Sequence, residues 1–190
     1  MYTPLISIHK KPNIFIRLVV GLNSLDEERV GLDTSIKWSL EKGRKSQGTL
    51  TTQNANGSAQ ITYDLCEVEP VVGYYSIRGR ATQCWSVSDP NTGTQYLIKD
   101  CWKDETRVSE YIYLEDAKGL AGVAQMASFE PNRGETKLLL DGRGVLHEDF
   151  HNRIAVRIIM SSYGKSIEHF KSAKQLLRAL RDALIGTFSC

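Results

Sequence analysis

The stretch YYSIRGRATQCWSVSDPNTGTQYLIKD, residues 74–100, decides the fold that this sequence predicts. Its second half holds two β-forming segments on either side of Asp89–Gly93, where proline fixes φ and glycine accepts a positive φ. Strands joined by so short a turn pair as an antiparallel hairpin. Before the hairpin, Gly79 lies between two arginines in a turn flanked by β-forming residues, and Lys99 stands near the end of the last strand. The sequence therefore predicts a sheet built outward from this hairpin.

Further strands and helices extend in both directions from the hairpin. A helix is predicted over Asp104–Lys118, which Gly119 can end. A longer helix is predicted over Lys171–Thr187, because Ser172 and Gln175 have capping-box spacing and leucines repeat along one face. The other predicted strands are Asn13–Leu22, Ile36–Leu40, Ile61–Val72, Leu120–Phe129 and Arg153–Ser162. Polar, glycine-bearing composition predicts loops over Glu41–Ser58 and Glu130–Asn152.

The composition is that of a globular chain long enough for one ordinary domain. Of its 190 residues, 41% are apolar and 24% are charged, and a net charge of +2 gives no support for a nucleic-acid partner. The four cysteines are scattered and form no Cys-x-x-Cys pair, which favours a reduced, intracellular protein. Met1–Pro12 lacks the apolar core of a signal peptide. The longest apolar runs, Ile14–Leu22 and Ile154–Met160, are short and contain an arginine, so no membrane partner is expected.

Two features of the central stretch, together with an acid on the helix that follows it, point to the binding of an anion. The glycine turn leaves backbone N–H groups free to face a phosphate. Lys99 can reach the same space as a point charge, and an acid on the next helix can hold that lysine in place. Protein kinases bind the phosphates of ATP with these same parts. The corresponding residues here are Gly79, Lys99 and Glu110.

The spacing of the turn can be compared with the glycine loop of kinases, which ends in an apolar residue about fifteen positions before the lysine. Counting back from Lys99 reaches Cys84. Gly79 then stands at the middle glycine position of the loop, while Ile77 and Thr82 stand at the outer two. One of the three loop glycines is therefore present.

Several stretches, in the same order along the chain, resemble the fungal-type protein kinase domains. They are Val30–Ile36, Ser76–Thr82, Tyr96–Trp102, Ser109–Glu110, Arg157–Ile167, Phe170–Ser172 and Leu176–Ala183. The resemblance implies an α+β fold: a protein-kinase-like small lobe with a mostly antiparallel sheet and one packed helix. It also implies an N-terminal extension over residues 1–60, the small lobe over 61–163, and a hinge with the first long helix of an incomplete large lobe over 164–190.

The same resemblance implies ATP as the bound nucleotide. It assigns to ATP the loop residues Gly79, Thr82 and Cys84, Lys99 on the strand, Glu110 on the helix and Met160 at the hinge. Glu115 is the alternative partner of Lys99, because it lies at the more usual distance along the chain. The Ser109–Glu110 pair matches the family, which favours Glu110.

Two catalytic motifs of protein kinases do not occur in this sequence. It contains neither His-Arg-Asp, which supplies the catalytic base, nor Asp-Phe-Gly, which supplies a magnesium ligand. We therefore expect a truncated kinase that at best binds nucleotide and neither holds magnesium nor transfers phosphate by itself. The alternative is a non-catalytic interaction module, with a protein partner or self-association through the apolar face of residues 171–187.

A competing motif lies further along the chain. His147–His151 matches H-E-x-x-H, in which two histidines bind zinc and the glutamate is a general base. Glu168 or His169 would be a third ligand. Glycines precede the pentad and a strand follows it, which argues against the apolar-faced helix that such a site requires. A zinc hydrolase is therefore the third hypothesis.

Overall fold

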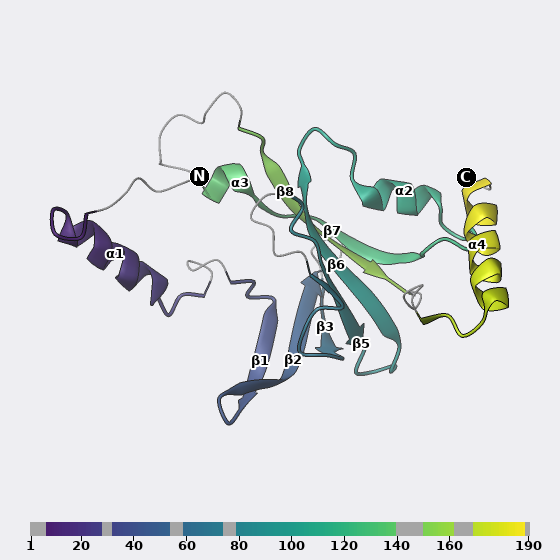
Figure 1. Cartoon of the computed structure of the whole chain (residues 1–190), viewed down its shortest axis with the longest axis horizontal. Coiled ribbons are helices and arrows are strands. Elements are labelled where there is room, and N and C mark those ends of the chain that lie inside the picture. Colours follow the sequence, from purple (N-terminus) through teal and green to yellow (C-terminus); the bar gives the residue numbers. More distant parts are fainter. Residues whose placement is uncertain are drawn as a thin grey trace. The chain divides into compact units, whose positions relative to one another are not determined.

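The computed structural model describes residues 7–27, 32–53, 59–73, 79–139, 150–161 and 169–188 (Figure 1). The chain divides into two compact units, residues 1–37 and residues 38–190. The fold is α+β, as predicted, with one eight-stranded sheet. Its helices are α1, Pro12–Leu22; α2, Glu110–Asp116; α3, Thr136–Leu139; and α4, Ala173–Phe188.

Helix α1 lies in the first unit, so the prediction of a strand over Asn13–Leu22 is wrong. The isoleucines and valines of this segment favour strands, but a helix satisfies the backbone N–H and C=O groups within the segment, without a pairing strand. Pro12 stands in the first helical turn, where its missing N–H costs nothing. At the other end, the Asn23 N–H donates to the Val19 carbonyl at 3.1 Å.

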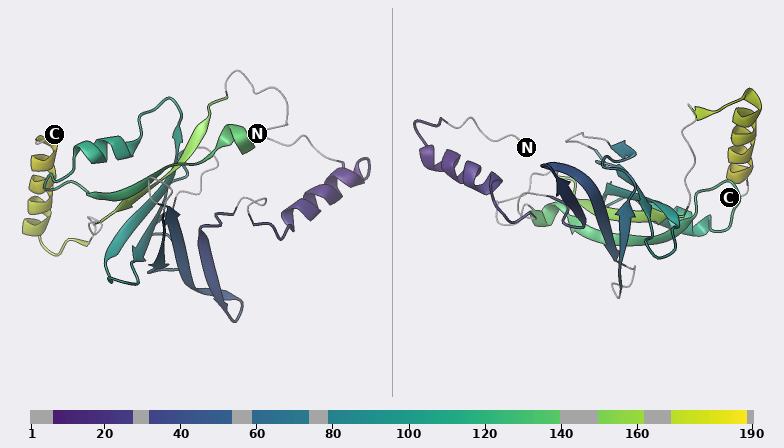
Figure 2. Two further views of the ribbon diagram at one scale, coloured as in Figure 1. Left: turned by 180° about the vertical axis from the view of Figure 1, so that it is seen from behind. Right: turned by 90° about the horizontal axis from the view of Figure 1, so that it is seen from below.

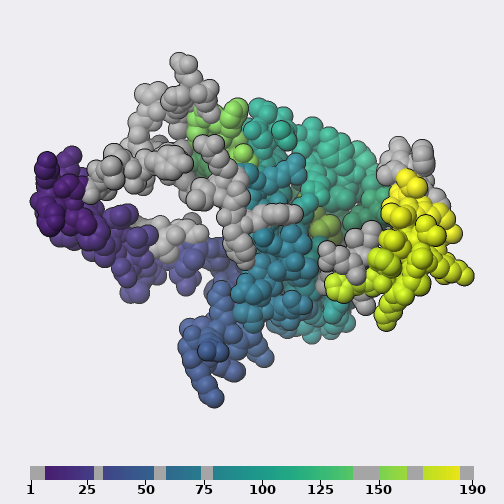
Figure 3. All heavy atoms as spheres, in the orientation of Figure 1, coloured from purple at the N-terminus to yellow at the C-terminus, as the bar shows by residue number. Residues whose placement is uncertain are grey.

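The sheet is antiparallel with the strand order β1-β2-β3-β5-β6-β8-β7, and β4 pairs with β5. The strands are β1, Ile36–Glu41; β2, Arg44–Gln53; β3, Gln60–Leu65; β4, Val72–Gly73; β5, Gln83–Ser88; β6, Gln95–Asp104; β7, Met126–Glu135; and β8, Arg153–Met160. The two views in Figure 2 show the twist of this sheet. In Figure 3 the residues of this sheet run in colour from blue at β1 to light green at β8.

The β5–β6 hairpin is confirmed where the sequence predicts it. β5 pairs with β6 along its whole length, in a register that sets Cys84 opposite Lys99. The Asp89 N–H donates to the Thr94 carbonyl at 2.9 Å, and Gly93 adopts a φ of 69°. The turn is therefore determined by local chemistry, since glycine is the residue that adopts this φ without strain.

Strand β2 lies within the predicted loop Glu41–Ser58, so the loop prediction is wrong for Arg44–Gln53, while residues 54–58 lie outside the described part. The strand buries Gly48, Leu50 and Thr52 on one face. This alternation is hard to see in the sequence, because two of the three inward residues are glycine and threonine. A Cβ at Gly48 would lie 2.6 Å from the Leu65 side chain, so glycine is what allows the strand to pack so closely.

Helix α2 is shorter than the predicted Asp104–Lys118 helix. Asp104 is the last residue of β6, and its carboxylate accepts the Thr106 N–H at 3.0 Å, which forms a turn instead of a helix start. On α2, the ring of Tyr111 stacks on Phe129 of β7 with 4.0 Å between ring centroids. This stacking fixes the helix against the sheet.

Strands β7 and β8 lie side by side; β7 departs from its predicted range, whereas β8 agrees with its own. β7 begins later than the predicted Leu120–Phe129 strand and extends into the predicted loop Glu130–Asn152, whose residues 140–149 lie outside the described part. β8 confirms the Arg153–Ser162 strand. It buries both faces from Val156 to Met160, because β6 and β7 pair with it on either side and make it a central strand.

Helix α4 confirms the helix predicted over Lys171–Thr187. The Gln175 N–H donates to the Ser172 hydroxyl at 3.2 Å, while the Gln175 side chain accepts the Lys171 N–H at 2.8 Å. Leucines on its apolar face are exposed: Leu177, Leu180 and Leu184. In the part of the chain that the structure describes, no helix is long and apolar enough to cross a membrane.

Candidate functional site

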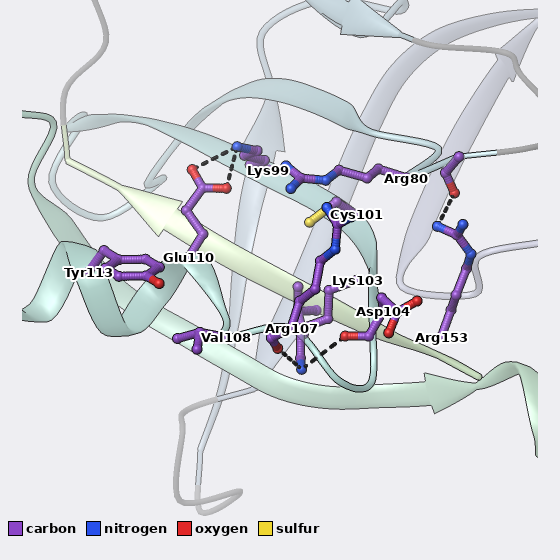
Figure 4. A pocket seen from close by; sticks show the side chains of 12 residues that line it. Arg80, Lys99, Cys101, Lys103, Asp104, Arg107, Val108, Glu110, Tyr113 and Arg153 are labelled. Carbon is purple, nitrogen blue, oxygen red and sulfur yellow. Dashed lines mark hydrogen bonds and ion pairs between the residues drawn. The ribbon is translucent and has the colours of Figure 1, made fainter. Parts of the chain in front are cut away.

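An ion pair joins the sheet to α2. The Lys99 ammonium lies 2.7 Å and 2.6 Å from the two carboxylate oxygens of Glu110 (Figure 4). Alternation along β6 points Lys99, Cys101 and Lys103 to one face of the sheet. Glu110 is the first residue of α2, so its carboxylate meets Lys99 at the near end of the helix. Of the two acids that the sequence left open, the structure pairs Glu110 with Lys99.

The ion pair lies in a cleft of about 630 Å³ between the sheet and the start of α2. The cleft is lined by Gly79, Arg80, Lys99, Cys101, Lys103, Asp104, Arg107, Val108, Glu110, Tyr113, Arg153 and Val156. Five of these residues are cationic and two are acidic. The wall is therefore predominantly positive and suits an anionic ligand.

The glycine turn forms one rim of the cleft. Gly79 adopts a φ of 119°, which strains any residue with a Cβ. Its carbonyl accepts a hydrogen bond from Arg153 of β8 at 2.7 Å, and the Arg80 carbonyl accepts one from the Trp102 N–H at 2.8 Å. These two bonds tie the end of the turn to β8 and β6. Residues 74–78, the preceding half of the turn with Ile77, lie outside the described part.

Two buried thiols lie beside Lys99. Burial raises the pKa of the Cys101 thiol, and the positive charges of Lys99 and Arg80 oppose that rise. Burial likewise raises the pKa of Cys84, against the charge of Lys99. Both thiols are therefore held in the neutral form next to the ammonium group, and they act as small apolar residues under the cleft.

The structure brings some of the predicted site residues together and separates others. Lys99, Glu110 and Gly79 line the same cleft. Cys84 is buried directly opposite Lys99 in the β5–β6 register, whereas Thr82 and Met160 do not line the cleft as described. The alternative acid, Glu115, lines a smaller cavity of about 190 Å³ between α2 and β7.

The sequence analysis missed the four other cations of the cleft: Arg80, Lys103, Arg107 and Arg153. Lys103 could have been found, because it lies four residues after Lys99, and side chains at even spacing along a strand share one face. Arg153 could not, since it reaches the cleft through the pairing of β8 with β6. The Lys103 ammonium donates to the Arg107 carbonyl at 2.9 Å, which holds the segment before α2 against the sheet.

The predicted zinc motif falls mostly outside the described residues, which include only Phe150 and His151 of His147–His151. His151 lies 3.9 Å from the Asp104 carboxylate. Among the described residues, His, Cys, Asp and Glu form no group of three or more that could hold a metal ion.

The fold is an α+β domain in which a sheet lysine pairs with a helix glutamate beside a glycine turn, in a cleft with a mostly positive wall. The comparison with known families gives it a narrower class. The family model described as fungal protein kinase matches residues 2–137 and 127–189. The chain therefore belongs to the fungal protein kinase family, and the resemblance predicted from the sequence is confirmed. No curated protein matches the chain.

Proposed function

We propose that this chain is the ATP-binding small lobe of a fungal protein kinase, and that Lys99 contacts the phosphates of the nucleotide. The observation that carries the proposal is the ion pair between Lys99 and Glu110, which spans from a central strand to a helix beside the Gly79 turn. In protein kinases a strand lysine paired with a helix glutamate is required for phosphate binding. Family membership supports the same reading.

The residues of the cleft fit a nucleotide phosphate. The Lys99 side chain is 21% exposed, so its ammonium remains open to a ligand while Glu110 holds it in place. Phosphate oxygens accept charge-assisted hydrogen bonds from such an ammonium. Bound ATP would supply the γ-phosphoryl group of a kinase reaction, and the residues of this chain would bind and orient it.

Magnesium, which kinases use with ATP, does not fit the donor set of the cleft. Magnesium prefers carboxylate and water oxygens. Only two carboxylates are among the lining residues described: Glu110 binds Lys99 with both of its oxygens, and Asp104 accepts the hydroxyl of Thr106 at 2.6 Å with one of its own. The sequence also contains neither His-Arg-Asp nor Asp-Phe-Gly. We therefore assign to this chain nucleotide binding without phosphoryl transfer.

Thermal unfolding in the presence of ATP tests the proposal. ATP should raise the Tm of the wild-type chain and leave that of Lys99→Ala unchanged, because binding to the folded state stabilises it. Lys174→Ala is the matched control, since Lys174 is an exposed lysine on α4. The same ATP-induced shift in Lys99→Ala as in the wild type would rule out Lys99 as the phosphate contact.

A non-catalytic interaction module is the second candidate, and the exposed leucines of α4 favour it. Leu177 is 66% exposed and Leu184 is 58% exposed. Apolar surface of this kind marks contact sites for other proteins or for a second copy of the chain. Free thiols at Cys66, Cys84 and Cys101 are compatible with a reducing, intracellular compartment for either function.

A further inference from the structure

The cleft at Lys99 carries more positive charge than its own carboxylates neutralise. Five of the lining residues are cationic and two are acidic. Glu110 is bound by Lys99, and Asp104 accepts both the N–H and the hydroxyl of Thr106, at 3.0 Å and 2.6 Å. Hydrogen bonds from neutral donors leave Asp104 charged, so the five cations of the wall exceed its two carboxylates by three.

Two guanidinium groups contribute to this excess of positive charge. Arg80 reaches from the glycine turn toward Lys99 in Figure 4, and Arg107 comes from the segment that leads into α2. Among the described residues, neither forms an ion pair, whereas Lys103 and Arg153 donate to backbone carbonyls. Arg80 and Arg107 are both exposed residues, so their donors are available to a ligand.

We propose that this cleft binds the polyphosphate chain of a nucleotide as the metal-free anion, with Arg80 and Arg107 supplying the counter-charge that magnesium supplies in other nucleotide sites. This inference rests on the proposed function and adds the charge state of the ligand. A guanidinium group presents several donors in one plane and binds two phosphate oxygens at once. A magnesium ion on the phosphates would occupy the same oxygens and cancel part of the attraction to the cleft.

Calorimetric titration of the full chain with ATP tests this inference when it is carried out in EDTA and again in excess magnesium chloride. Inorganic triphosphate is a second probe, because it carries the phosphates without adenine. The wild-type chain should bind ATP at least as tightly in EDTA as in magnesium. Arg80→Gln and Arg107→Gln should each weaken metal-free binding about tenfold, in line with the loss of a charge-assisted hydrogen bond. The two substitutions should weaken the binding of magnesium-bound ATP by a smaller factor.

Arg44→Gln is the matched control, since Arg44 is an exposed arginine on β2 that does not line the cleft. Its affinity should equal that of the wild type in both buffers. ATP binding that requires magnesium, or unchanged affinity in both cleft variants, would overturn the inference and leave the Lys99 site intact. Absence of ATP and triphosphate binding in either buffer would overturn the inference and the proposed function together. Circular dichroism of each variant confirms that it is folded.

Discussion

Lys99 and Asp100 are neighbours on β6, yet their ion pairs lie on opposite faces of the sheet. Lys99 pairs with Glu110 at the cleft. Asp100 accepts two hydrogen bonds from the fully buried Arg157, at 2.7 Å and 2.8 Å. Arg157 also donates to the Thr51 carbonyl of β2 at 3.0 Å. One face of β6 therefore presents charge to the cleft, while the other uses charge to join β8, β6 and β2.

Loss of the buried pair should destabilise the fold. In Arg157→Met, Asp100 stays partly buried, and among the described residues its remaining ion pair is with Arg133 at 3.2 Å. We expect a loss of about 3 kcal/mol in the free energy of unfolding, measured by urea titration. The matched control is Arg181→Met, which breaks an exposed pair with Asp182 and should cost less than about 1 kcal/mol. Equal losses in the two variants would contradict this role of Arg157.

Close packing at Gly48 should make even one added methyl group harmful. The Cβ of Gly48→Ala would lie 2.6 Å from the Leu65 side chain and 2.7 Å from the ring of Trp38. We expect a loss of about 1–3 kcal/mol, measured by urea unfolding. Gly134→Ala is the control, because its Cβ would lie 3.8 Å from Trp102, at ordinary contact distance. If Gly48→Ala unfolds at the wild-type urea concentration, β2 does not pack as described.

The two glutamates of α2 should respond differently to the loss of charge. Glu110→Gln removes the carboxylate that holds Lys99, so ATP affinity should fall about tenfold when measured by calorimetry. Glu115→Gln should leave the affinity unchanged, because Glu115 lines the separate cavity next to Phe129. The reverse result would make Glu115 the functional acid.

Alkaline pH should destabilise the fold through its buried thiols. Burial raises the pKa of Cys84 and Cys101, so the unfolded chain gives up these protons first as the pH rises. The protonated thiols contribute fully to the free energy of unfolding below the ordinary thiol pKa of about 8.5. This contribution is lost as the pH rises toward the raised pKa of the folded chain. The Tm of the double variant Cys84→Ala, Cys101→Ala should therefore fall less steeply with pH. Cys66→Ala, which removes an exposed thiol, is the control variant.

The exposed leucines of α4 should cause self-association. We expect the apparent mass of the wild-type chain to rise with concentration in light scattering, because association would cover Leu177, Leu180 and Leu184. Leu177→Lys combined with Leu180→Lys should reduce that rise, whereas Arg178→Lys on the same helix should not. A wild-type chain that stays monodisperse and monomeric at all concentrations would contradict a role of α4 in self-association.

The sequence by itself determined the features that depend on neighbouring residues. The Asp89–Gly93 turn encodes its own geometry, so the β5–β6 hairpin was predictable. The start of α4 follows from the spacing of Ser172 and Gln175. Family membership was also evident from ordered stretches, and with it the candidate pair Lys99 and Glu110.

Only the tertiary structure decided the features that depend on distant partners. β2 looks like a polar loop in sequence, because its inward face becomes apparent only where Gly48 meets Leu65. The positive wall of the cleft also depends on residues that are distant in the sequence. Arg80 and Arg153 are far apart in the chain, and sheet pairing brings them to one rim beside Gly79. Composition reports how much charge a chain carries, whereas long-range pairing sets where that charge gathers.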